Sequence, residues 1–275
     1  MKKQLLIAAV AATMASATFA DVSITGGSEV TIAKSGTTVE TTLGLKGKSG
    51  DTSVTIDLDL HNAAGDNLVK NAYMNTSVVG IAVKAGQWKS GASNLGRSSY
   101  KTGAYNLSTS FSGVKLAYEE TGSGSTNSVT VSGTVAGISA SHKINSSSLT
   151  ETKVSGAFGG VNLAYHLKEA NATDDNTAIS VSTTVGNVKL AYTTIDIEAA
   201  LSGMDGAISD TTGTVNVGTH NAMTVSTAVA GNTVTFKRYE LNDVSNNKII
   251  VKRGNLKATY NDNADTLEVE LAVKF

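Results

Sequence analysis

The side chains that could carry out chemistry are few, and their spacing forms no catalytic or metal-binding pattern. Cysteine is absent, which excludes thiol catalysis, and no serine lies in a G-x-S-x-G segment. The histidines show no HExxH or other metal-ligand spacing, and we interpret all of them as loop residues: His61, His142, His166 and His220. Asp57 and Asp59 would share one face of a strand, where paired carboxylates could bind Ca²⁺ or act as an acid–base pair. Electrostatic lining of a wall that faces lysines is the favoured interpretation of this pair.

Other charged residues alternate with apolar ones, so that residues i and i+2 share one face of an extended segment. The acidic members are Glu40, Asp57, Asp59, Glu119, Glu268 and Glu270. The basic members are Lys46, Lys48, Lys84, Lys115, Lys153, Lys189, Lys237, Lys252, Lys257 and Lys274, and an intervening loop adds Lys89, Arg97 and Lys101. Such faces suit the lining of a wet passage, where opposed walls create a transverse field and rings of one sign select ions. The basic residues outnumber the acidic ones, which predicts a weak preference for anions.

The beginning of the chain resembles a secretory signal peptide. Two lysines follow Met1, a short apolar run follows them, and small residues lead to Ala20. We expect residues 1–20 to be removed, with cleavage after Ala17 as the alternative, and residues 21–275 to form one domain. Removing Lys2 and Lys3 leaves 22 − 2 = 20 basic against 23 acidic residues, a net charge of −3. That balance does not favour nucleic-acid binding.

The rest of the chain reads as short strands joined by two alternating kinds of connection. Proline is absent and glycine is abundant at 27 residues, which suits a chain that is nearly all paired strand. Tight glycine turns lie at Gly50, Gly80, Gly113, Gly137, Gly160, Gly186, Gly231 and Gly254. Longer polar loops lie at 34–37, 61–69, 89–102, 120–127, 145–149, 170–176, 195–221, 241–246 and 261–265. This alternation is typical of a transmembrane antiparallel β-barrel, all-β, with short periplasmic turns and longer extracellular loops. The count predicts 18 strands, with 16 as the alternative.

The last strand has one wholly apolar face and ends in an aromatic residue. Its apolar face holds Leu267, Val269, Leu271, Val273 and Phe275. This alternation resembles the signal by which outer-membrane proteins are recognised by the barrel assembly machinery. The resemblance implies insertion into outer-membrane lipid, with the apolar face outside and Glu268 and Glu270 inside.

Residues 71–87 and 97–118 resemble the strands that flank the constriction loop of the general diffusion porins. The first segment holds Asn71-Ala72-Tyr73-Met74, a turn at Val79-Gly80, and a strand that ends in Gly86-Gln87; the second holds Tyr105, Phe111-Ser112-Gly113 and Tyr118. The resemblance implies a homotrimer without a cofactor that passes small hydrophilic solutes, with residues 88–102 folded inward as a constriction loop. The chain departs from the family in its short length, its lack of proline, and a loop without acidic residues.

Two other functions remain open at this point. A secreted β-rich adhesin would carry the same signal peptide, but it would not need a terminal Phe275 or the alternation of turns. An outer-membrane barrel enzyme would need a catalytic constellation at the rim, and the sequence contains none that we can identify.

Overall fold

The computed structural model describes residues 21–34, 36–60, 69–90, 95, 100–122, 126–169, 171–199, 217–241 and 244–274. The first strands are β1 (Asp21–Ala33), β2 (Gly36–Ser49), β3 (Thr52–Asp59), β4 (Val69–Val78), β5 (Ile81–Lys89), β6 (Tyr100–Phe111), β7 (Val114–Glu120), β8 (Asn127–Val135) and β9 (Ile138–Asn145). The others are β10 (Thr150–Phe158), β11 (Val161–Glu169), β12 (Asp175–Val185), β13 (Val188–Ile197), β14 (Gly218–Val229), β15 (Asn232–Leu241), β16 (Val244–Arg253), β17 (Leu256–Asn261) and β18 (Thr266–Lys274). None of the residues described here forms a helix long and apolar enough to cross a membrane.

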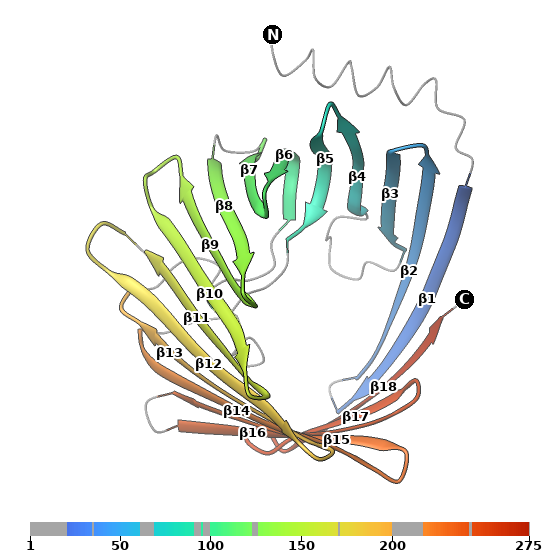
Figure 1. Ribbon diagram of the computed structural model, residues 1–275. Helices are drawn as coiled ribbons and strands as arrows, with labels where there is room; N and C mark the ends of the chain where they lie inside the picture. Colours follow the sequence, from blue (N-terminus) through green and yellow to red (C-terminus); the bar gives the residue numbers. More distant parts are fainter. Residues whose placement is uncertain are drawn as a thin grey trace.

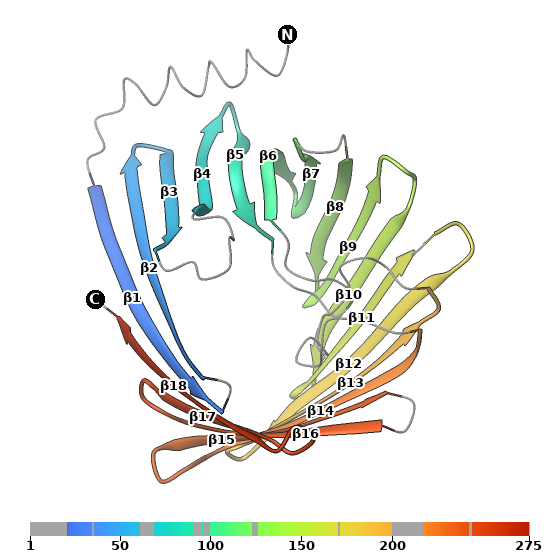
Figure 2. The same cartoon turned by 180° about the vertical axis from the view of Figure 1, so that it is seen from behind.

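The strands form one closed antiparallel barrel. Each strand pairs with its neighbours along the chain, and β1 pairs with β18 from Gly27–Lys274 to Ala33–Glu268. The strands follow one another around the ring in sequence order (Figures 1 and 2). Because the ring closes, each described strand is paired on both sides over part or all of its length, so a chain without disulfides satisfies most of its strand backbone through the ladder. The prediction of an 18-stranded all-β barrel is confirmed.

Glycine turns at one end of the barrel fix the hairpins. All the predicted tight turns lie between strands, and their glycines have a positive φ, as at Gly80 (77°) and Gly113 (83°). Two-residue turns of this kind follow the twist of the strands but require left-handed backbone. The connections at the other end are less uniform than predicted. Those at 34–35 and 242–243 are also only two residues long, because flanking residues join the ladder.

The repeated apolar segments occupy one face of the barrel. Leu116 pairs with Val131, and Leu163 pairs with Val181, so apolar side chains lie opposite one another across strands. Leu116 is 49% exposed and Val131 is 45% exposed. A continuous face of exposed apolar side chains is the surface that a barrel presents to lipid.

Candidate functional site

Leu95 identifies the face of the barrel that points inward. It lies in the connection between β5 and β6, yet it is fully buried in a cluster with side chains of β12 to β15. These partners are Ala178, Ile195, Ile197, Ala222 and Tyr239. Strands so far apart around the ring are reached only through the interior, so the face with these partners is the inner face. Cross-strand partners point to the same side of a sheet, which extends this assignment to every strand.

The predicted charges of the strands fall on the inner face. Lys84 pairs with Asn106 and Asn106 with Glu119, while Lys189 shares a row with Ser226 and Thr184. The same ladder places the following predicted residues on this face: Glu40, Lys46, Lys48, Asp57, Asp59, Lys101, Lys115, Lys153, Lys237, Lys252, Lys257, Glu268, Glu270 and Lys274. Where the pairing is regular, the ladder and the alternation of residues in the sequence assign the same side.

Lys89 and Arg97 do not join this set. Lys89 is the last residue of β5 and pairs with Tyr100 on the opposite side from Trp88, with its Nζ 5.6 Å from the Tyr100 ring centroid. Arg97, the terminal Phe275 and the expected signal peptide at 1–20 lie outside the described residues. The other members of the proposed insertion signal, Leu267, Val269, Leu271 and Val273, lie on the outer face of β18.

Lys101 reaches the inner face through a bulge. Gly86 pairs with Ala104, but the next inner position of β5, Trp88, pairs with Lys101, so β6 contains one extra residue. Gly103 has a φ of 58°, the left-handed conformation that such a bulge requires. Without the extra residue Lys101 would point outward. With it, Lys101 forms an ion pair with Glu119.

Lys84 is held between two aromatic rings on the same part of the wall. Its Nζ lies 4.0 Å from the ring centroid of Tyr73 and 4.5 Å from that of Trp88. A cation over two ring faces is favourable and fixed in direction. The bulge and the aromatic pair thus place Lys84, Lys101 and Glu119 together near the base of the connection that carries Leu95.

Carboxylates concentrate on the inner face of four adjacent strands, β18, β1, β2 and β3. They are Glu268, Glu270, Glu29, Glu40, Asp57 and Asp59, and Asp21 lies at the end of β1 opposite Lys48. Glu29 lies directly opposite Glu40, and like charges that face each other across a ladder are unfavourable. A gathering of this kind suggests a functional reason for the negative charge. The lysines of these strands, Lys46, Lys48 and Lys274, lie toward the end that carries the β2–β3 turn.

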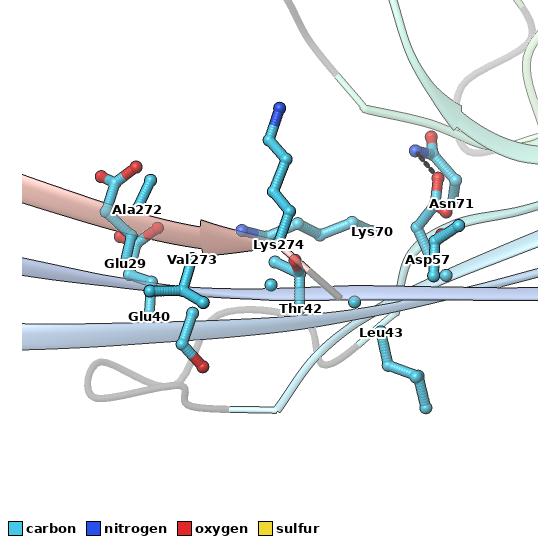
Figure 3. A pocket seen from close by; sticks show the side chains of 15 residues that line it. Glu29, Glu40, Thr42, Leu43, Asp57, Lys70, Asn71, Ala272, Val273 and Lys274 are labelled. Carbon is cyan, nitrogen blue, oxygen red and sulfur yellow. Dashed lines mark hydrogen bonds between the residues drawn. The ribbon is translucent and has the colours of Figure 1, made fainter. Parts of the chain in front are cut away.

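A recess of about 520 Å³ opens along this acidic part of the wall. Glu29, Glu40 and Asp57 line it together with Lys70, while Leu43 points to the other side of the sheet (Figure 3). Asn71 donates a 2.8 Å hydrogen bond to Asp57, and Lys70 forms a 2.6 Å ion pair with Asp59. Asp57 thus accepts a hydrogen bond from Asn71, and the charge of Asp59 is neutralised by Lys70. Among the described residues no three acidic or histidine side chains form a metal-binding group.

The remaining wall is mainly basic. Between β4 and β17, most charged side chains of the inner face are lysines. The acidic side chains of the inner face on the described parts of these strands are Glu119 and Glu151. Sequence reasoning missed several members of both sectors: Glu29, Lys70, Lys143, Glu151, Lys168 and Lys248. Most of them lie near strand ends, beside the expected loops. The cross-strand partner, which is the signal that assigns them, is not visible in the sequence alone.

The histidines were assigned wrongly as loop residues. His142, His166 and His220 lie within β9, β11 and β14, and His61 lies outside the described residues. His166 and His220 point inward, with 4% and 2% of their surfaces exposed. A buried histidine in a strand needs a hydrogen-bond partner on a neighbouring strand, and Glu151 is that partner for His166.

Solved porin structures match this architecture. One engineered variant of the Rhodopseudomonas blastica porin is 12% identical, covers 93% of this chain and 100% of its own, and has a TM-score of 0.54. The protein has the porin fold. A second variant of that porin, 11% identical, covers 93% of this chain and 99% of its own with a TM-score of 0.52. No protein-family model matches the chain, and no curated protein matches it in sequence.

Proposed function

We propose that the protein is an outer-membrane porin through which small hydrophilic solutes and ions diffuse down their gradients. The observation that carries the proposal is a closed barrel with an apolar outer face and a charged inner face. Eighteen strands, at about 4.8 Å spacing and a tilt of about 40°, give a barrel roughly 35 Å across between backbones. Side chains from the wall cannot fill such a width, which favours a water-filled passage.

The segment 88–102 is proposed to narrow this passage as an inward-folded loop. Leu95 supports the proposal because its side chain is fully buried against inner-face residues of β12 to β15. Solutes would pass beside the loop, between the acidic sector of β18 to β3 and the basic sector formed by the other strands. Opposed walls orient dipolar solutes and separate the paths of cations and anions. The excess of inner-face lysines supports a weak preference for anions.

The surroundings of the channel are proposed from the sequence and from the resemblance to general porins. The sequence supports export through a cleaved signal peptide at 1–20 and insertion into outer-membrane lipid. It also supports recognition by the assembly machinery of the apolar residues of the last strand, Leu267, Val269, Leu271, Val273 and Phe275. A homotrimer follows from the resemblance to general porins. An enzymatic role gains no support from Glu151 and His166, which are engaged with each other by a 2.7 Å hydrogen bond.

Liposome swelling tests the proposal. Purified protein that shows heat-modifiable gel mobility is placed in liposomes, and swelling is followed in sugars of increasing size. A porin gives rapid swelling with small sugars and a decline with size, and the boiled protein gives none. An adhesin fails to enter the bilayer. A barrel enzyme enters it but leaves the liposomes sealed, and either result contradicts the proposal.

A further inference from the structure

The inner face of β9, β10 and β11 carries a compact group of basic side chains. Lys143 pairs with Glu151 across β9 and β10, and Glu151 pairs with Lys168 across β10 and β11. The adjacent inner row pairs Lys153 with His166. With strands about 4.8 Å apart, Lys143 and Lys168 start about 10 Å apart, a distance that two extended lysine side chains can span. Three lysines therefore surround one carboxylate.

Glu151 is already engaged by two of its neighbours. One of its oxygens, Oε1, lies 2.8 Å from Lys153 Nζ and 2.7 Å from His166 Nε2. An ionised carboxylate only accepts hydrogen bonds, so the ring nitrogen of the almost fully buried His166 donates to it. Within the part of the chain that the structure describes, Lys143 and Lys168 form no ion pair. The three lysines and the one glutamate leave two uncompensated positive charges.

The group lies against Leu95 of the connection between β5 and β6. Lys168 Nζ lies 3.4 Å from the carbonyl oxygen of Leu95, a long contact that leaves its other protons available. The group is thus beside the place where Leu95 packs on the wall. A solute that passes this contact meets the uncompensated lysines.

We propose that Lys143, Lys153 and Lys168 form a binding site for a small divalent oxyanion of the phosphate or sulfate class. The proposal rests on the proposed pore function and adds a ligand to it. Each ammonium donates to a separate oxygen, which a tetrahedral oxyanion offers and a chloride ion does not. The two negative charges of such an anion also balance the two positive charges of the lysines that Glu151 leaves uncompensated. Glu151 and His166 act as positioning residues, since they hold Lys153 and do not contact the anion themselves.

Planar-bilayer recording with inorganic phosphate tests the site. Chloride current through the intact protein is measured while phosphate, and separately sulfate, is added to one side. We expect saturable block in the unchanged protein and an apparent dissociation constant weaker by about tenfold or more in Lys143→Gln/Lys168→Gln. The matched control is Lys248→Gln/Lys252→Gln, which removes two inner-face lysines of β16 and should retain the block. Lys143→Arg/Lys168→Arg should restore much of it.

The outcomes separate this inference from the pore function. Channels that conduct chloride without saturable block by phosphate or sulfate overturn the site and leave the porin intact. Equal weakening in the two double variants also overturns it, because the effect would then come from the general charge of the wall. Protein with native gel mobility that conducts in no buffer contradicts the porin function itself.

Discussion

Replacement of Leu95 by alanine is expected to widen the channel. The side chain is 0% exposed, and its partners Ala178, Ile195, Ile197, Ala222 and Tyr239 come from the inner wall. Truncating a leucine in such a packed site costs about 2–5 kcal/mol. We take a loss of about 3 kcal/mol of packing energy, and about 1.4 kcal/mol corresponds to a factor of ten in an equilibrium constant. The equilibrium between the packed and the unpacked state of residue 95 then shifts by roughly 100-fold toward the unpacked state.

Single-channel conductance and the sugar size limit in liposomes measure this change. Leu95→Ala should raise both, because the segment 88–102 loses its contact with the far wall. Leu95→Met fills a similar volume with an apolar side chain and should leave both near the unchanged values. If Leu95→Ala keeps native gel mobility, conductance and size limit, then the contact does not hold a constriction and the reasoning is wrong.

Three further changes have defined outcomes. Gly86→Ala should prevent barrel assembly, seen as loss of heat-modifiable mobility, because a Cβ there would lie 2.2 Å from the backbone oxygen of Ala72. Val79 holds a φ of 50° at a turn with 98% exposure, so Val79→Asn should raise the free energy of unfolding by about 1 kcal/mol, measured by urea titration in detergent. Glu29→Gln/Glu40→Gln should move the reversal potential toward anion selectivity, and the shift should shrink from 0.1 to 1 M salt as the screening length falls from about 10 to 3 Å.

The strand count and the side of the charges within regularly paired strands were predictable because they depend on local rules. Glycine marks the tight turns at one end of the barrel, and the period of two places Lys84, Lys115 and Glu119 on the inner face. Closure then follows from the sheet itself. These features need only the residue and its immediate neighbours along the chain.

Other features depend on contacts between distant segments and could not be predicted. The bulge at Gly103 reverses the face of Lys101, and only pairing with β5 reveals it. The side chain of Leu95 packs against residues of β12 to β15, and no pattern in residues 88–102 points to those strands. The inward positions of His166 and Glu151 likewise depend on each other across two strands, whereas a single sequence suggests only a polar strand end.

Recording from the purified protein in a planar bilayer tests the central claim most directly. A diffusion porin with this charged wall gives stepwise insertions with ohmic conductance that rises with salt concentration, and a reversal potential that shows weak anion preference. Cation selectivity would contradict the assignment of the basic wall as the dominant sector. Natively migrating protein that inserts without any conductance would contradict the claim that the barrel encloses an open passage.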